Sequence, residues 1–406
     1  MKAIYTAKSF SGETKGGEME VKNERDLAAS LRADGYILTS FKEIKKEESA
    51  KIKIRILDRI RGVSLKEKMM FARNLRVMIS SGLTLSRAVH NISVQTKNKR
   101  FSEILVQIFA DLQAGATFAD SLAKYPAIFS DLFINMVRVG EASGNLEEVM
   151  GILELQLEKE HELTSKVKGA MTYPAVILVV MVGIGIIMLT YILPKLMGVF
   201  KDMDVALPRS TQVIIFISDT LRQYHFLVMG GFIILAVFLK IFLTTKSGKR
   251  TVSFLAINIP LINNIVIKVN CARFARVYSS LLKSGVSVVE ALRIVSRTLT
   301  NHYYKIAFEE GIEQVQKGVN LSKVIEKNSK VFPVLVVQMV EVGEETGKTE
   351  SILLKLAEFY EEEVNNITKN MSSIIEPVLM VIIGSAVGFF AVSMLQPMYS
   401  IMDNIK

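Results

Sequence analysis

The sequence predicts an all-α, multi-pass membrane protein with two copies of one helical bundle, three membrane-spanning helices and a small α+β N-terminal unit. Three observations predict this fold. Half of the 406 residues are hydrophobic, three apolar runs are long enough to cross a bilayer, and one pattern of residues occurs twice at a constant offset. A soluble chain of this length would have difficulty burying so much apolar surface, so we expect a membrane component before any motif is considered.

The N-terminal segment predicts the small α+β unit. Glycines at Ser11-Gly12 and Gly16-Gly17 predict the turns of a β-hairpin, and Glu24 to Ala33 predict a helix. The Lys/Glu-rich stretch Lys42 to Lys53 predicts a charged, mobile linker. Met1 to Ser49 is polar and lacks the apolar core of a signal peptide, so we expect the N-terminus to stay in the cytoplasm.

Three apolar runs predict the spans. Ala175 to Leu193 contains no charge, Phe226 to Leu243 carries only Lys240 near its end, and Pro377 to Met402 is the third. Two crossings separate the two bundles, so the bundles share one side of the membrane in either orientation. The positive-inside rule makes that side cytoplasmic, because the cations flanking the first two spans outweigh the balanced loop between them. These cations are Lys166, Lys168, Lys246, Lys249 and Arg250.

An internal repeat organises the chain. Phe71-Ala-Arg73 recurs as Phe274-Ala-Arg276, 203 positions later (274 minus 71). The same offset, without a gap, relates further pairs and extends into the spans. Among these pairs are Ser81-Gly82 and Ser284-Gly285, Gln113-x-Gly115 and Gln316-x-Gly318, Met136–Glu141 and Met339–Glu344, Glu158 and Glu361, and Pro174 and Pro377. Chance does not produce such a register, so we infer a duplicated bundle-plus-span unit with an extra span between the copies.

Each copy predicts about six helices. Ser64-Leu-Lys-Glu67 has the form of a capping box, and the apolar residues after it repeat at helical spacing until Gly82. Ser287-Val-Val-Glu290 is the matching start signal in the second copy. Long charged helices, about Asn145 to Ala170 and Thr349 to Ser373, then approach the spans. Pro174 and Pro377 follow these two helices, where a kink or a fresh helix start is expected.

The predicted division of the chain follows from these signals. It comprises the N-terminal unit (1–41), the charged linker (42–62), the first cytoplasmic bundle (63–171), the first span (174–196), an external loop (197–224), the second span (225–244), the second bundle (266–373) and the third span (377–402).

The segment Gly343-Glu-Glu-Thr-Gly347-Lys348-Thr349 is similar to a phosphate-binding loop but has the wrong spacing. Such a loop needs four residues between its glycines and follows a strand. Here three residues separate the glycines, and the preceding segment predicts helix. The other copy has Gly144-Asn145-Leu146 instead. We therefore expect a duplicated helix–helix turn.

Several acidic and small residues have two interpretations each. Glu141 and Glu344 follow a glycine, which favours capping of the following helix N-terminus over cation binding. A second group of acids forms either a docking stripe or a solvated helix face: Glu158, Glu160, Glu361, Glu362 and Glu363. Gly384-Ser-Ala-Val-Gly388 has the small-xxx-small form that favours close contact between membrane helices, with lipid exposure as the alternative.

The remaining chemistry-bearing residues predict no enzyme site. Cys271 is the only cysteine, and its neighbours predict a buried thiol rather than a nucleophile. The four histidines have no metal-ligand spacing. The net charge of +10 fits membrane orientation better than nucleic-acid binding, since no basic segment carries interleaved aromatic residues. We therefore assign no catalytic, cofactor-binding or metal-binding residue, and no cofactor.

Several segments together resemble a known family. Lys166-Val-Lys-Gly-Ala-Met-Thr-Tyr173-Pro174, the paired Val-Gly-Glu-x-(Ser/Thr)-Gly turns at Val139–Gly144 and Val342–Gly347, and Leu207-Pro-Arg-Ser-Thr211 are similar to segments of the inner-membrane platform proteins of type II secretion and type IV pilus assembly. The resemblance covers essentially the whole chain. The second copy has Ile375-Glu376 in place of Thr172-Tyr173, so the first copy carries the signature better.

The resemblance implies a function without chemistry of its own. It implies an oligomer in the cell inner membrane that contacts a cytoplasmic hexameric assembly ATPase, pilin-like subunits and other inner-membrane assembly proteins. Such a protein couples the ATPase to assembly of pilin-like subunits and does not bind nucleic acid directly. Some relatives bind a divalent cation at an acidic loop; the nearest match here is Glu141, where Asn145 stands instead of a second acid.

Two other classes of function stay open at this stage. A polytopic transporter or channel subunit would need polar residues inside the spans, and the spans offer only Thr190, Ser385, Ser393 and Gln396. An enzyme using Gly347-Lys348-Thr349 would need nucleotide affinity that depends on Lys348. The sequence does not distinguish secretion, pilus extension and DNA uptake, because cargo is chosen elsewhere.

Overall fold

The N-terminal unit is a three-stranded antiparallel sheet with one helix. In this computed structural model the described residues are 2–9, 14–20, 24–33, 35–43, 62–195 and 209–404. Strands β1 (Lys2–Ser9), β2 (Thr14–Glu20) and β3 (Tyr36–Glu43) pair in the order β2-β1-β3, and α1 (Glu24–Ala33) packs against them. Ala7, Leu27 and Leu31 form the core of this unit.

The predicted helix of this unit is confirmed, and two details of the prediction change. Gly16 and Gly17 lie inside β2, paired with Thr6 and Tyr5, and do not form a turn. Strand β3 was not predicted, and it extends into the segment predicted as linker. Ser11-Gly12 and the rest of the linker up to residue 61 lie outside the described residues.

The two bundles have six helices each, as predicted, and their helix bounds follow the same offset. The first bundle contains α3 (Leu65–Ser80), α4 (Leu85–Gln95), α5 (Lys99–Gln113), α6 (Phe118–Ala123), α7 (Asp131–Ser143) and the start of α8 (Leu146–Ile187). The second contains α13 (Pro260–Lys283), α14 (Val288–Thr298), α15 (His302–Gln316), α16 (Leu321–Glu326), α17 (Val334–Thr346) and the start of α18 (Thr349–Asn404). From α4 to α7 both ends of each helix shift by 203 positions, so the duplication preserves each turn.

Local signals explain where the helices begin. Ser64 and Glu67 form the predicted capping box at α3, with the Glu67 carboxylate accepting from the Ser64 N–H at 2.6 Å. Ser287 caps α14 by accepting from the Glu290 N–H at 3.4 Å. Ser287 is therefore the start of the counterpart of α4, and it does not match Ser64, which precedes α3.

Aromatic side chains fill both cores at corresponding positions. Phe71, Phe101 and Phe129 are fully buried in the first bundle, with ring centroids 5.7 to 6.3 Å apart. The second bundle has Phe274, Tyr304 and Phe332 at the equivalent positions. Because these positions keep large apolar rings in both copies, the helices pack in one arrangement twice.

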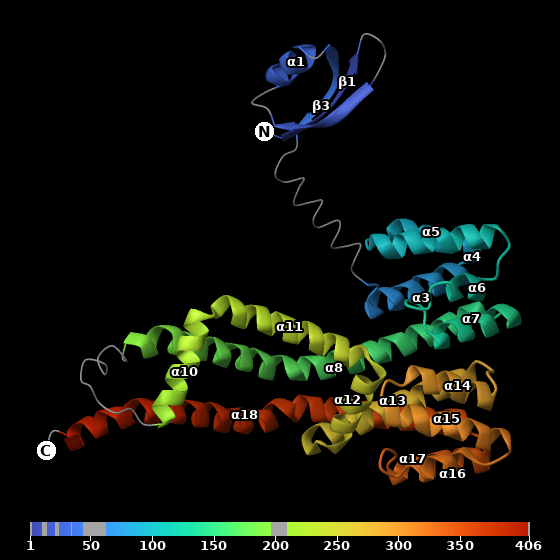
Figure 1. Ribbon diagram of the computed structural model, residues 1–406. Coiled ribbons are helices and arrows are strands. Elements are labelled where there is room, and N and C mark those ends of the chain that lie inside the picture. The colour runs from blue at the N-terminus through green and yellow to red at the C-terminus, as the bar shows by residue number, and fades with distance from the viewer. Residues whose placement is uncertain are drawn as a thin grey trace.

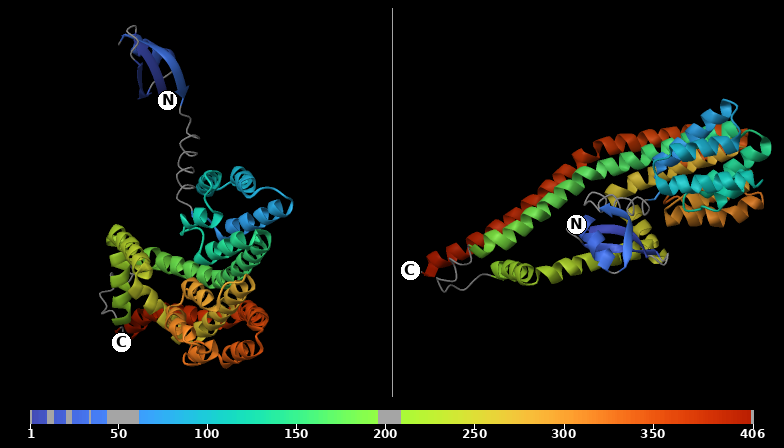
Figure 2. Two further views of the ribbon diagram at one scale, coloured as in Figure 1. Left: turned by 90° about the vertical axis from the view of Figure 1, so that its right-hand side faces the viewer. Right: turned by 90° about the horizontal axis from the view of Figure 1, so that it is seen from above.

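The spans continue directly from the bundles. Helix α8 continues without interruption through Pro174, and α18 is 56 residues long, about 84 Å at 1.5 Å per residue. The expectation of a fresh helix start at Pro174 is therefore wrong. Figure 1 and Figure 2 show α8 and α18 side by side, leaving their bundles in the same direction.

A third apolar helix, α11 (His225–Thr244), returns from the far end of the spans toward the bundles. Among the described residues, three helices are long and apolar enough to cross a membrane, and their apolar stretches are almost entirely exposed on the protein surface. The pair α12 (Lys246–Asn258) and α13 is bent by 110° and passes the same test of length and composition only when joined. Since α13 carries core residues of the second bundle, it is not a span.

The segment predicted as an external loop contains a helix. Helix α10 (Arg209–Gln223) contacts α18 and the π-helical segment η1 (Met188–Ile192) at the end of the first span. The Ser218 hydroxyl donates to the carbonyl of Leu189 at 2.6 Å, and the Thr211 hydroxyl donates to the carbonyl of Ser393 at 2.6 Å. Through these two bonds, α10 ties the far ends of two spans together. The Leu189 carbonyl is available because it lies in η1, where a π-helical turn leaves a carbonyl that needs an external donor.

Candidate functional site at the junction of the repeats

The paired glutamates lie near the C-terminal ends of α7 and α17, just before the turn into the last helix of each bundle. Glu141 lies in α7, and its carboxylate accepts from the N–H groups of Phe118 (2.7 Å) and Ala119 (3.0 Å). These are the first two N–H groups of α6, which have no acceptor inside that helix. The expectation that Glu141 caps the following helix is therefore wrong: it caps α6, which precedes it in the chain.

Glu344 makes the same contacts in the second bundle. Its carboxylate accepts from the N–H of Leu321 (2.5 Å) and from the N–H (3.0 Å) and hydroxyl (2.7 Å) of Ser322. These bonds use much of the capacity of the carboxylate. No group of three His, Cys, Asp or Glu side chains that could hold a metal ion occurs among the described residues. Glu141 and Glu344 thus fasten α6 to α7 and α16 to α17.

The glycines of the same turn allow close approach and reversal. A Cβ on Gly140 would lie 2.8 Å from Cγ2 of Val149, and one on Gly343 would lie 3.0 Å from Cα of Thr349. Gly347 ends α17 in the left-handed conformation, with φ 68°, which favours glycine. The segment from Gly343 to Thr349 is a helix–helix turn, with Thr349 as the first residue of α18.

Most of the predicted acidic stripe is paired inside the chain. Glu361 binds Arg276 through two bonds of 2.8 Å, and both side chains are largely buried. Glu363 binds Lys268 at 2.5 Å, and Glu160 binds Arg273. These three carboxylates stabilise the fold and are not free for docking. Neither a free stripe nor a wholly solvated face describes the set.

Contacts between the bundles define an inter-repeat seam, formed by α7 and α8 of the first bundle and α13 and α14 of the second. Arg273 donates to both oxygens of Glu160, at 2.5 and 2.8 Å. The Ser280 hydroxyl donates to Oε1 of Gln156 at 3.4 Å. The seam is therefore held by side chains on different faces of the duplicated unit: the α7/α8 face of one copy meets the α13/α14 face of the other.

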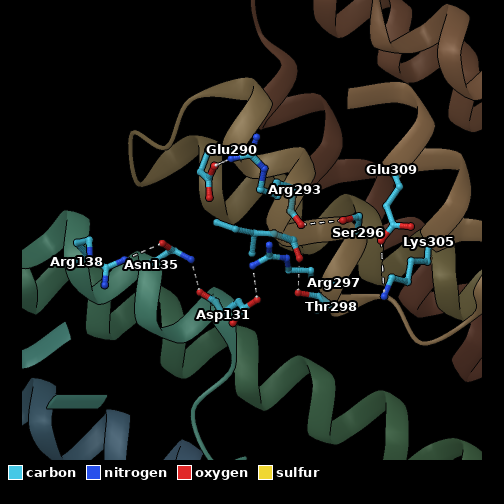
Figure 3. A network of polar contacts seen from close by, with 11 residues as sticks. Asp131, Asn135, Arg138, Glu290, Arg293, Ser296, Arg297, Thr298, Lys305 and Glu309 are labelled. Carbon is cyan, nitrogen blue, oxygen red and sulfur yellow. Dashed lines mark hydrogen bonds and ion pairs between the residues drawn. The ribbon is translucent and has the colours of Figure 1, made fainter. Parts of the chain in front are cut away.

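An ion pair at the edge of the seam is shown in Figure 3. Arg297 of α14 donates to a carboxylate oxygen of Asp131 at 3.1 Å. Asn135, one turn along α7, donates to the carbonyl of Asp131 at 2.8 Å and accepts from Arg138 at 3.3 Å. Both Arg297 and Asp131 are more than two-fifths exposed, so the pair orients the bundles more than it stabilises them.

Most seam residues have exposed apolar counterparts in the other copy; the exception is Glu160, whose counterpart Glu363 binds Lys268. Arg297 and Ser280 correspond to Val94 (74% exposed) and Val77 (57%). Asp131 and Gln156 correspond to Val334 (70%) and Phe359 (46%). We call Met70, Val77 and Val94 the open α3/α4 face, and Val334, Leu335 and Phe359 the open α17/α18 face. The first copy thus leaves one seam face uncovered, and the second copy leaves the other.

The other residues considered in the sequence form no reactive centre. Cys271 is buried, and burial raises the pKa of its thiol to about 12, against a weaker opposing effect of the Tyr304 hydroxyl. A protonated thiol in this environment is a poor nucleophile. No heavy atom lies within 4 Å of a Cβ built on Gly384 or Gly388. The predicted close helix contact at these glycines is therefore not made by any other described part of the chain.

Sequence reasoning missed the seam. Its residues are ordinary polar side chains with no motif, and the only signal was a comparison of the two copies position by position. Positions that are polar in one copy and exposed apolar in the other mark the faces that differ between them. The turn glutamates, in contrast, were visible from sequence because both copies keep them.

The fold and the seam define a class: a multi-pass membrane scaffold built from two copies of one helical bundle, with both bundles at one end of the spans and uncovered apolar faces on each. The family model described as type II secretion system (T2SS), protein F matches residues 71–194 and again 274–397. The two matches have the offset of the internal repeat. The chain belongs to the type II secretion system protein F family.

Relatives with two kinds of name align along nearly the whole chain. The type IV pilus assembly protein PilC of Thermus thermophilus is 34% identical over 99% of this chain and 98% of its own length. The PilC of Myxococcus xanthus is 32% identical over 99% and 95%. The type II secretion system protein F of Vibrio cholerae is 29% identical over 99% and 98%. The family resemblance predicted from the sequence is thus confirmed.

Proposed function

We propose that this chain is a non-enzymatic platform of the inner membrane that couples a cytoplasmic assembly ATPase to assembly of pilin-like subunits. The observation that carries this proposal is the continuity of α8 and α18 from bundle to span. A helix without a break transmits rotation or displacement of its bundle directly to the membrane. The names of the relatives, in pilus assembly and in type II secretion, support this role.

Charge supports a cytoplasmic position for both bundles. Lys166 and Lys168 lie on α8 just before the first span, and α12, just after the second span, carries Lys246, Lys249 and Arg250. Segments next to membrane spans that are rich in Lys and Arg favour the cytoplasmic side. An ATPase and its energy source are on that side, so bundles placed there can receive its motion.

The coupling is tested by interrupting α8. Two glycines inserted after Gly169, between bundle and span, should abolish pilus assembly or secretion in a deletion strain while ATPase co-purification persists. The control is the same insertion in the linker after Glu47, which should leave both intact. Normal assembly with the α8 insertion would refute transmission through the helix. If the ATPase does not co-purify with the wild-type chain, the proposed contact with the ATPase is wrong.

We infer that a second copy of this chain covers the open faces. If two chains meet as the two copies do within one chain, the open α17/α18 face of one chain contacts the open α3/α4 face of the next. In that contact Val334 and Val94 replace the pair Asp131–Arg297, and Phe359 and Val77 replace the pair Gln156–Ser280. Each corresponding pair joins two exposed apolar side chains, whose burial is favourable. A head-to-tail contact of this kind repeats by rotation. Within one chain, α8 and α18 leave the two bundles in the same direction. A contact between chains that repeats the relation of the two bundles therefore gives every chain the same orientation in the membrane.

Disulfide trapping tests this contact. In a Cys271→Ala background, Val94→Cys with Val334→Cys should form a disulfide between chains under mild oxidation. The control combines Val334→Cys with Val106→Cys, an exposed valine on α5 outside the open faces, and should not. Equal cross-linking of both pairs, or only monomers with the first, would overturn the assignment.

A further inference from the structure

A cavity of about 600 Å³ lies where the second bundle meets the membrane. Its walls come from α8 of the first copy, from α11, α12 and α13, and from the loop before α15. Apolar side chains dominate the walls: Leu163, Val167, Leu243, Val252, Ile265 and Val269. Leu243 is at the end of the second span, so the cavity opens at the level of the membrane surface.

Two exposed lysines border the cavity. Lys168 lies six residues before Pro174, about 9 Å along the helix, and Lys249 lies in the first turns of α12. Within the part of the chain that the structure describes, neither lysine has an acidic partner at ion-pair distance. Arg273 also lines the cavity, but Glu160 neutralises it. The cavity therefore combines an apolar interior with two uncompensated positive charges.

A buried amide in the wall lacks a partner. Asn270 is 4% exposed; its Nδ2 donates to the carbonyl of Val266 at 2.7 Å, while its Oδ1 accepts no hydrogen bond from the described residues. A buried amide oxygen without a donor is costly. This oxygen is sealed inside the wall, so it offers no hydrogen bond to a molecule in the cavity.

Helix α12 lies at the membrane surface by its own pattern. Phe254, Leu255 and Ile259 at and near its C-terminal end are exposed, while its cations cluster in the first two turns. Exposed apolar side chains beside lysine and arginine are typical of a helix that rests in the lipid headgroup region. A lipid from the adjacent leaflet therefore has direct access to the cavity.

We propose that this cavity binds one anionic glycerophospholipid. An acyl chain fills the apolar interior, and the phosphate lies between Lys168 and Lys249. Basic pockets between membrane helices on one leaflet suit such headgroups. Because α8 belongs to the first copy and α13 to the second, the lipid joins the two copies at the membrane surface.

The test uses the delipidated full chain in a neutral detergent, with lipid binding followed by native mass spectrometry. Phosphatidylglycerol and phosphatidic acid, which are both anionic, should bind, and phosphatidylcholine should not. Lys168→Gln with Lys249→Gln should weaken phosphatidylglycerol binding about thirtyfold, since each lysine near a headgroup contributes about a factor of five.

The matched control removes the same charge from the same helices. Lys166 and Arg250 lie on α8 and α12 but do not line the cavity, so Lys166→Gln with Arg250→Gln should change binding less than threefold. An equal loss in this control, or equal binding of phosphatidylcholine to the wild type, would overturn the proposal. So would binding of soluble glycerol 3-phosphate as tight as that of the lipid. The comparison of headgroups on the wild type decides the question even where a variant does not fold.

Discussion

Replacing Glu344 by alanine tests the role of the paired glutamates. The carboxylate accepts three hydrogen bonds from Leu321 and Ser322, and alanine leaves the first two N–H groups of α16 without acceptors. Glu344 is half-buried, so water replaces part of the loss. Hydrogen bonds to a charged group contribute about 1.5–3 kcal/mol each when fully buried, and loss of a helix cap costs about 1 kcal/mol. We therefore expect Glu344→Ala to lower the free energy of unfolding of the second bundle by about 3 kcal/mol.

Cys271 provides the assay, because it is the only cysteine and is fully buried in the same bundle. A fluorogenic maleimide reacts with it only on unfolding. A loss of about 3 kcal/mol should lower the labelling midpoint by roughly 10 °C for a domain of this size. Glu345→Ala, at the exposed neighbouring position, is the control and should shift the midpoint by less than about 2 °C. If Glu344→Ala shifts it no more than Glu345→Ala, the carboxylate does not fasten α16.

Three further variants probe burial in the bundles. Arg276→Met should destabilise the chain by about 3 kcal/mol, because it leaves Glu361 buried without its partner, and adding Glu361→Leu should restore most of the loss in the same labelling assay. Gly140→Ala should cost about 2 kcal/mol, since its Cβ would lie 2.8 Å from Val149; a combined Val149→Ala should relieve the overlap in thermal unfolding. Burial raises the pKa of Cys271 from 9.0 to about 12. The contribution of this thiol to the stability of the fold is therefore fully present below about pH 9 and is lost as the pH rises toward 12. The native thiol is both buried and protonated, so at pH 8 it should label much more slowly than the unfolded one. Equal labelling rates of native and unfolded protein would contradict this.

The helices and their order were predictable because their signals are local and occur twice. The capping box at Ser64 and the constant offset defined both bundles before any contact was known. Helix α12 and strand β3 were missed for opposite reasons. Strand β3 depends on pairing with β1, whereas the mixed polar and apolar residues of α12 show neither a span nor a soluble core pattern.

The direction of the glutamate contacts was beyond the sequence. Glu141 precedes α8 by a few residues, so proximity in the chain suggested that it caps α8. In the fold, the Glu141 carboxylate near the C-terminal end of α7 instead reaches the N-terminus of α6. Proximity along a chain favours local caps, but packing decides which helix end is nearest. The same limit hid the partners of Glu160 and Glu361, which lie on α13.

The two copies differ where a platform needs them to differ. Buried positions keep aromatic rings in both, whereas exposed ion pairs change freely: Lys124 binds Asp111 in the first copy, and Lys327 binds Gln314 at the equivalent place. Drift of this kind costs little, because an exposed ion pair contributes little to stability. Four seam positions differ in another way: Asp131, Gln156, Ser280 and Arg297 are polar where the copies meet, and their counterparts are exposed apolar residues. An uncovered valine or phenylalanine in a soluble bundle carries a risk of aggregation unless a partner covers it. The exposed apolar side chains at these positions are thus the strongest reason to expect that the single chain is one part of a larger assembly.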